Sequence, residues 1–162
     1  MSLSDGKSRL TERQESLVSY WKSKCSDGLW PSRQDINPGH VLNALASISL
    51  VEKRGDQFRF RLTGSSLRRV FGGDLTGQVI REIDRLGEDA GSASMSIALE
   101  TGRPVYGSRK IGSEWHIWLR LPLLNEHGAP DLVLCADEVV QADPDAKERP
   151  AFARQYYGRA AA

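Results

Sequence analysis

Cysteine and histidine are scarce in this chain of 162 residues, which has two cysteines and three histidines. Cys25 and Cys135 lie far apart and lack the close spacing of metal-ligating cysteines. The sequence has no apolar run of signal-peptide length at its start, and no stretch approaches the roughly 18 apolar residues of a membrane span. From these absences we expect one soluble domain, without a metal site, in a reducing cytoplasm.

A large excess of positive charge is also missing, because the chain has 22 basic and 21 acidic residues and a formal net charge of +1. Four arginines lie close together, but the chain as a whole has no field that would hold a polyanion. We therefore expect no nucleic-acid partner and interpret these arginines as part of a solvated surface. They are Arg59, Arg61, Arg68 and Arg69.

Apolar residues near the start recur at spacings of three, four and seven, which predicts an amphipathic helix over residues 11–25. Thr11 and Gln14 form a capping box at its start. Residues 1–10 are expected to be a disordered leader. A second, short helix should begin at Asn37 and Pro38.

Alternation of apolar and polar residues from Ile48 to Leu62 predicts a β-hairpin with its turn at residues 54–56. Phe58, Phe60 and Leu62 should share the buried face. Burying each contributes roughly 2 kcal/mol, whereas burying the unpaired arginines between them would cost more.

A helix is expected over residues 88–101, ending at Gly102, followed by strands at about 103–110, 113–124 and 131–140. The last strand is apolar on both faces, so something must cover the outer face of the sheet. The N-terminal helix and a second subunit are the two alternatives. The dimer-face candidates are Leu17, Val18, Trp21 and Trp118, which we expect in one patch.

Residues 141–162 are expected to be a loosely attached extension in which Phe152 and Tyr156 pin one helical turn.

The stretch GGDLTGQV at residues 72–79 has the glycine spacing of a phosphate-binding loop. Gln78 stands where that loop needs Lys, and Val79 where it needs a hydroxyl. We therefore interpret the stretch as a turn that stops a helix at Gly72 or Gly73 and bends again at Gly77.

Three motifs, at residues 30–36 (WPSRQDI), 62–64 (LTG) and 73–77 (GDLTG), together resemble the signature of the single-domain PAS-like family of alphaproteobacteria. The likeness covers residues 11–140, and Ser65 stands where the family commonly has Thr. The resemblance implies an α+β fold: a five-stranded antiparallel sheet with short helices on one face, preceded by the N-terminal helix. It also implies a sensory or regulatory module that binds a small ligand, a partner, or both.

Two cofactors known from PAS domains do not fit the residues. Haem-binding members need an axial ligand, usually a His on or near the helix before the third strand, and residues 88–101 have no His. Flavin-photoadduct members need a Cys in an Asn-Cys-Arg-Phe-type helix, which the sequences around Cys25 and Cys135 do not resemble. The sequence argues against both groups and leaves any other cofactor unknown.

Seven residues are candidates for lining a ligand pocket or filling the core: Phe58, Phe60, Phe71, Met95, Trp115, Ile117 and Leu119.

Arg33 and Asp35 are candidates for a loop contact, and a structural ion pair that pins the loop is favoured over a ligand contact. His116, opposite Asp137 or Glu138, is the one arrangement that suggests acid–base chemistry, although a surface or half-buried His is the favoured interpretation.

From these patterns we predict a non-enzymatic sensor or adaptor that forms a homodimer and acts on a separate signalling protein. Two alternatives stay open. One is a protein-interaction domain with a filled core. The other is a small-molecule enzyme with a cavity under the sheet, in which His116 acts as acid or base.

Overall fold

A computed structural model describes residues 10–80, 89–141 and 155–156 of the chain. Its helices are α1 (Glu12–Lys24), α2 (Leu67–Phe71) and α3 (Ser94–Thr101), with the 3₁₀ segments η1 (Arg33–Asp35), η2 (Pro38–His40) and η3 (Leu42–Ser47) and the π-helical segment η5 (Asp89–Ala93). Its strands are β1 (Ile48–Arg54), β2 (Gln57–Thr63), β3 (Val105–Ile111), β4 (Glu114–Leu123), β5 (Leu132–Gln141) and β6 (Gln155–Tyr156).

The strands form one antiparallel sheet in the order β2-β1-β5-β4-β3-β6. The five longer strands confirm the predicted α+β fold. The sixth, β6, has two residues and pairs with Val105 and Tyr106 on the outer edge of β3. The helical turn expected at Tyr156 is therefore wrong, because the backbone there adds to a sheet edge. Phe152 lies outside the described residues.

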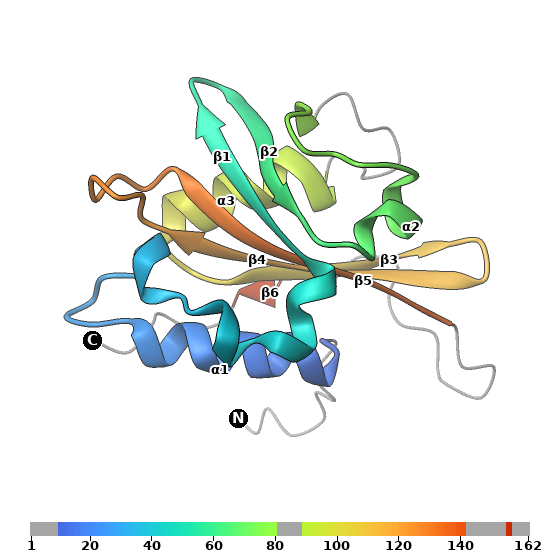
Figure 1. Cartoon of the computed structure of the whole chain (residues 1–162), viewed down its shortest axis with the longest axis horizontal. Helices are drawn as coiled ribbons and strands as arrows, with labels where there is room; N and C mark the ends of the chain where they lie inside the picture. Colours follow the sequence, from blue (N-terminus) through green and yellow to red (C-terminus); the bar gives the residue numbers. More distant parts are fainter. Residues whose placement is uncertain (1–9, 81–88, 142–154, 157–162) are drawn as a thin grey trace.

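Helices cover both faces of the sheet, with α1 along one face and α2 and α3 on the other (Figure 1). The two faces bury separate apolar clusters, one containing Leu17, Trp21 and Leu119 and the other Phe60, Met95 and Trp118. Between the two alternatives for the outer face, the structure places the chain's own N-terminal helix there.

The start of α1 is set by its own sequence. The Thr11 side chain accepts the N–H of Gln14, and the Gln14 side chain accepts the N–H of Thr11, so the predicted capping box is confirmed. The Gln14 amide also donates to the carbonyl oxygens of Ile117 and Ala136, at 3.0 and 3.2 Å. The cap thus fixes the helix on strands β4 and β5 as well as starting it.

The β1–β2 hairpin turns at residues 55 and 56, as predicted, but Leu62 is not buried. A β-bulge shifts the register so that Val51 pairs with Phe60, whereas the adjacent Leu50 pairs with Leu62. The extra residue turns Leu62 to the face opposite Phe60 and leaves it 55% exposed. Simple alternation gave the wrong face because the bulge breaks the period of two.

The predicted helix after Asn37 is two 3₁₀ segments, η2 and η3, with Val41 between them. Asn37 caps the first by accepting the N–H of Gly39 at 2.9 Å. At the end of β2, Gly64 passes so close to η3 that an added Cβ would collide with the carbonyl oxygen of Ala46. The Gly of the LTG motif therefore permits β2 and η3 to pack.

The GGDLTG stretch is a turn, as predicted. Gly72 ends α2 with φ of 85°, and Gly77 has φ of 84°. Asp74 accepts the backbone N–H of Thr76 at 3.0 Å and the hydroxyl of Thr63 at 3.1 Å. The bonds from Thr76 are the main cause that holds the pKa of Asp74 below its usual range. The loop places α2 beside the hairpin.

Candidate functional site

A cluster of ionisable side chains is buried inside the molecule, on the face of the sheet that α2 and α3 cover. His116 and Arg120 come from β4 and Asp137 from β5, and their exposures are 0%, 0% and 2%. Asp137 pairs with Trp118, so His116 and Arg120 are its two diagonal neighbours on the same face. The strand register therefore brings the three side chains together.

Arg120 donates two hydrogen bonds to the Asp137 carboxylate, from Nη1 to Oδ2 at 3.0 Å and from Nη2 to Oδ1 at 2.9 Å. His116 Nε2 lies 2.8 Å from the same Oδ1. Arg120 also donates from Nε and Nη2 to the carbonyl oxygen of Ala90, at 3.1 and 2.6 Å. One guanidinium thus joins two strands of the sheet to the segment η5.

The charges on Asp137 and Arg120 stabilise each other. Burial by itself raises the pKa of Asp137, but the positive charge of Arg120 and the hydrogen bond from His116 outweigh it, so the pKa is lower than usual. Burial likewise opposes the charge on Arg120, and the neighbouring carboxylate restores it, so the pKa of Arg120 is raised. Asp137 and Arg120 are therefore an ionised pair at neutral pH.

The cluster is enclosed by apolar and weakly polar groups. The Phe71 and Trp118 rings lie 5.7 and 5.8 Å from the His116 ring, centroid to centroid. Cys135 is fully buried beside Arg120, and burial is the main cause that raises its pKa to about 12. This cysteine is therefore a thiol and not a reactive thiolate.

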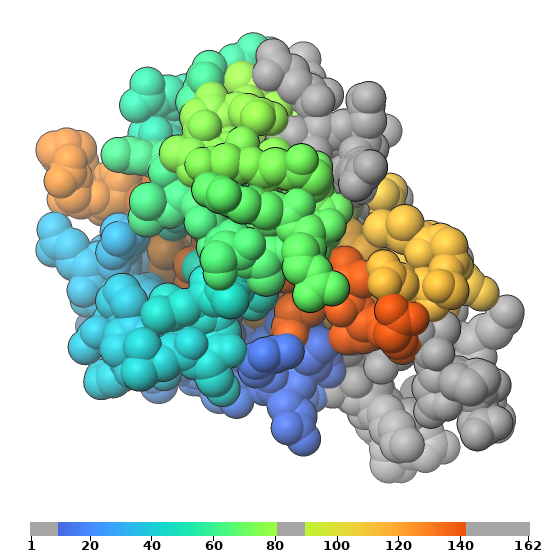
Figure 2. All heavy atoms as spheres, turned by 45° about the vertical axis from the view of Figure 1, so that its right-hand side comes forward, coloured from blue at the N-terminus to red at the C-terminus, as the bar shows by residue number. Residues whose placement is uncertain are grey.

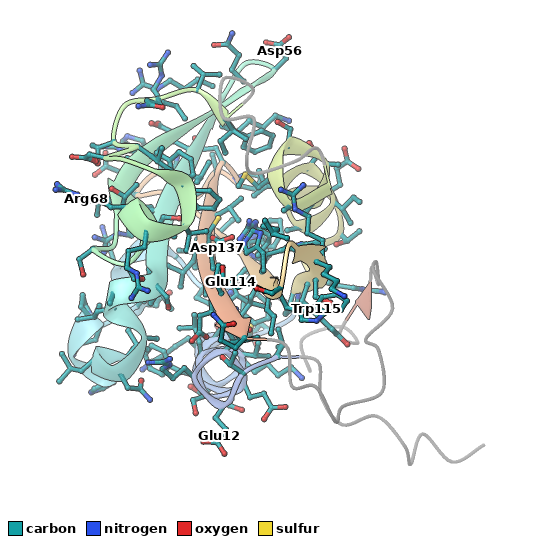
Figure 3. The ribbon with its side chains drawn as sticks, turned by 90° about the vertical axis from the view of Figure 1, so that its right-hand side faces the viewer. Glu12, Asp56, Arg68, Glu114, Trp115 and Asp137 are labelled. Atoms are coloured by element: carbon teal, nitrogen blue, oxygen red, sulfur yellow. The ribbon has the colours of Figure 1, made fainter. Side chains whose placement is uncertain are left out.

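A cleft of about 860 Å³ opens next to the cluster. Its walls come from η3 (Asn43, Ser47), α2 (Arg69) and the end of β5, with Asp137 among the lining residues. The space-filling view shows this end of β5 at the surface between α2, α1 and the β3–β4 hairpin (Figure 2). Asp137 points into the interior beside β5, whereas Glu12 on α1 points away from the sheet (Figure 3).

Most charged groups along the cleft already have partners. Glu138 accepts from Arg13 at 2.9 Å and from the hydroxyl of Thr11. Glu114 accepts from the amide of Gln141 at 2.8 Å. Arg69 is exposed and forms no ion pair with any residue that the structure describes. Arg69 is therefore a cation at the cleft that no acidic neighbour among the described residues neutralises.

A second hollow, of about 120 Å³, lies between the 3₁₀ segments and the hairpin. Arg33, Leu45 and Leu62 are among the residues that line it. It is apolar and shares no residue with the cleft beside β5.

The seven pocket or core candidates divide between the two faces of the sheet. Phe58, Phe60, Phe71 and Met95 pack with Trp118 under α2 and α3, whereas Ile117 and Leu119 pack under α1. Trp115 is 7% exposed and belongs to neither cluster. None of the seven lines either hollow.

The dimer-face candidates are buried within this chain. Leu17, Val18 and Trp21 pack on the chain's own sheet, where the Trp21 ring N–H donates to Pro122 O at 2.9 Å. Trp118 lies on the opposite face, so its expected place in one patch with α1 is wrong. Both faces of β4 are buried, and alternation could not decide which helix covers which face.

Arg33 and Asp35 do not form the expected ion pair, and both side chains are exposed. Asp35 instead accepts from the backbone N–H and the hydroxyl of Ser32, at 2.9 and 3.1 Å. The loop is held to the sheet by backbone bonds: Arg33 N–H donates to Leu124 O, and Leu124 N–H donates to Pro31 O, each at 2.9 Å.

His116 is neither at the surface nor half-buried, and that expectation is wrong, although its expected neighbour Asp137 is present. Sequence reasoning missed Arg120 altogether. The signal was available: from Trp115 to Leu124, Arg120 and His116 are the two residues able to carry charge, in an otherwise apolar segment. Such residues are buried only when they are paired, and the pairing partner was not evident from the sequence.

The fold and site together define an α+β module with helices on both sides of an antiparallel sheet and a buried charged cluster. The family model of the PAS domain matches residues 10–96, more than half of the chain. The chain belongs to the PAS domain family, whose members are in general sensory or regulatory modules. No curated protein matches the sequence.

Within the described ranges, no cluster of three or more His, Cys, Asp and Glu side chains is arranged to hold a metal ion. The described helices are all too short or too polar to cross a membrane.

Proposed function

We propose that this chain is a regulatory module that acts on a separate signalling protein by binding a ligand or partner in the cleft beside β5. The observation that carries the proposal is the position of Asp137, which lines the cleft and is also bonded to Arg120 and His116. An occupant of the cleft would therefore lie next to a side chain that is coupled to the buried interior.

The coupling has a defined route. Arg120 joins Asp137 to the carbonyl oxygen of Ala90 in η5, and η5 leads directly into α3. An occupant that favours one arrangement of the Asp137 carboxylate would favour one arrangement of these helices on the sheet. This is a population shift between two packings, driven by differential affinity.

The packing of side chains between the sheet and helices α2 and α3 supports binding in the cleft rather than beneath these helices. Phe58, Phe60, Met95 and Trp118 are each 3% exposed or less and pack against one another there. The same observation favours the second candidate, a protein-interaction domain without a small ligand. In that case the cleft would bind polypeptide, and a homodimer would use a surface other than the sheet-facing side of α1.

The enzyme alternative is less well supported. His116 and Asp137 have the geometry of an acid–base pair, but His116 is 0% exposed, packs near two aromatic rings and does not line the cleft. General acid–base catalysis requires hydrogen-bond reach to the substrate. Burial removes that reach.

Native mass spectrometry of the purified full-length chain tests the proposal. We expect the wild type to retain a small molecule or a partner chain, and Asn43→Trp, which places a large ring in the cleft, to lose it. The matched control is Leu42→Trp, at an adjacent residue that is 69% exposed and lines neither hollow. Retention of the same species by all three proteins, or by none, would contradict the proposal.

A further inference from the structure

The strand β5 is longer than the neighbour on one of its sides. On one side, β4 pairs with it along its whole length, up to Glu114 opposite Gln141. On the other side, β1 starts at Ile48, which pairs with Ala136. The edge from Asp137 to Gln141 therefore has no strand beside it among the described residues.

The hydrogen-bond pattern shows which backbone groups point to this edge. Lys53 N–H donates to Asp131 O at 2.7 Å, so the backbone of Asp131 points toward β1. In an antiparallel strand, alternate residues point their N–H and C=O groups to the same side. The register of β5 with β4 has no break, so the backbones of Asp137, Val139 and Gln141 also point to the open side.

The cleft lies along this open edge. Its lining includes Asp137, Val139 and Gln141 from β5, together with Asn43 from η3 and Arg69 from α2. Five residues of extended chain span roughly 17 Å, and a strand added to a sheet lies about 4.8 Å from its neighbour. A cleft of about 860 Å³ has room for such a segment.

The charged side chains that line the cleft indicate which kind of extended segment it would bind. The acidic side chains of the cleft are already neutralised or hydrogen-bonded: Asp137 by Arg120, Glu138 by Arg13 and Glu114 by Gln141. Arg69 has no acidic partner among the described residues and is exposed at the cleft. An acidic side chain on the incoming segment would complement it, whereas a basic one would be repelled.

We propose that the open edge of β5 accepts an extended segment of a partner protein as an added strand, with an acidic side chain of that segment facing Arg69. Backbone hydrogen bonds to Asp137, Val139 and Gln141 hold the segment, and Arg69 selects its charge. The inference rests on the proposed function and names the kind of partner that the cleft binds.

The first test is selection from a displayed library of random peptides of about ten residues, the upper range of strand lengths. Selection on the wild type should enrich peptides with alternating β-branched residues and an acidic residue. The substitution Val139→Pro removes an edge N–H without removing a bond to β4, and it should weaken binding of the enriched peptides by about tenfold or more. Val139→Ala keeps that N–H and is the matched control, expected to bind like the wild type.

Charge reversal provides a variant that does not touch the sheet. Arg69→Glu should lose the acidic peptides, and a repeated selection on it should enrich basic ones. Enrichment of no peptide on the wild type, or of peptides that bind the wild type, Val139→Pro and Arg69→Glu equally, would overturn the proposal.

Amide hydrogen exchange on the full-length chain locates the bound peptide. The enriched peptide should slow exchange at Asp137, Val139 and Gln141. Slow exchange at these amides without peptide, or slowing that depends only on protein concentration, would mean that this chain or a second copy already occupies the edge, and would also overturn the proposal. If a small molecule binds in the cleft while no peptide does, the proposed function stands and the added strand falls.

Discussion

On the face of the sheet under α1, the buried side chains are mainly aliphatic, and Gln14 satisfies its amide on two backbone carbonyls. On the face under α2 and α3, an ionised Asp137–Arg120 pair and His116 are buried among aromatic rings. The first face is stabilised by removal of apolar surface from water. The second also depends on a polar network whose members need one another, and such a network can respond to binding.

The largest expected effect comes from breaking the ion pair. Arg120→Leu leaves the Asp137 carboxylate buried without its charge partner, and we expect a loss of about 3–5 kcal/mol in the free energy of unfolding. Urea denaturation monitored by tryptophan fluorescence measures it. The double variant Arg120→Leu/Asp137→Leu removes both charges and should be clearly more stable than the single variant. Equal stability of the two variants would show that the unpaired Asp137 carboxylate is not what destabilises Arg120→Leu.

Under α1 the comparable test is an aliphatic truncation. Leu17→Ala should cost about 2–4 kcal/mol through lost burial and the cavity left behind, because Leu17 is 1% exposed. The control is Leu29→Ala, at a residue that is 59% exposed, which should change stability little. The same urea titration applies. A Leu17→Ala loss as small as that of the control would show that α1 contributes little to this face.

The smallest and most specific effect concerns pH. The pKa of Asp137 is lower in the folded chain than in the unfolded one, where it is about 3.9. Its ionisation therefore stabilises the fold above about pH 4, and this contribution is lost as the pH falls through the lower, folded pKa. The stability advantage of the wild type over Asp137→Asn should shrink below pH 4. An advantage that grows on acidification would contradict the assignment of an ionised Asp137.

Much of the fold could be predicted because its signals are local. The capping box of Thr11 and Gln14, the turn at residues 54–56 and the glycine turn at residues 72–77 each involve groups a few residues apart. Alternation predicted the strands for the same reason. It misplaced Leu62, because a bulge is a property of the pair of strands and not of β2 alone.

Most of the candidate site could not be predicted from the sequence. His116 and Asp137 were recognised as neighbours, but His116 was expected nearer the surface and Arg120 was overlooked. In the sequence, Asp137 is 17 residues from Arg120 and 21 from His116, and Arg120 is 30 residues from Ala90. Only the register of two strands and the position of η5 bring these groups into contact.

The sequence by itself determined the order of helices and strands, the start of α1 and the turns, since capping, glycine conformation and hydrophobic period act within a few residues. The tertiary structure alone decided which helix covers which face, how Arg120 and Asp137 are buried together, and where β5 extends beyond the end of β1. The physical reason is that charge burial and strand edges depend on partners distant in the chain, whose positions are set by packing.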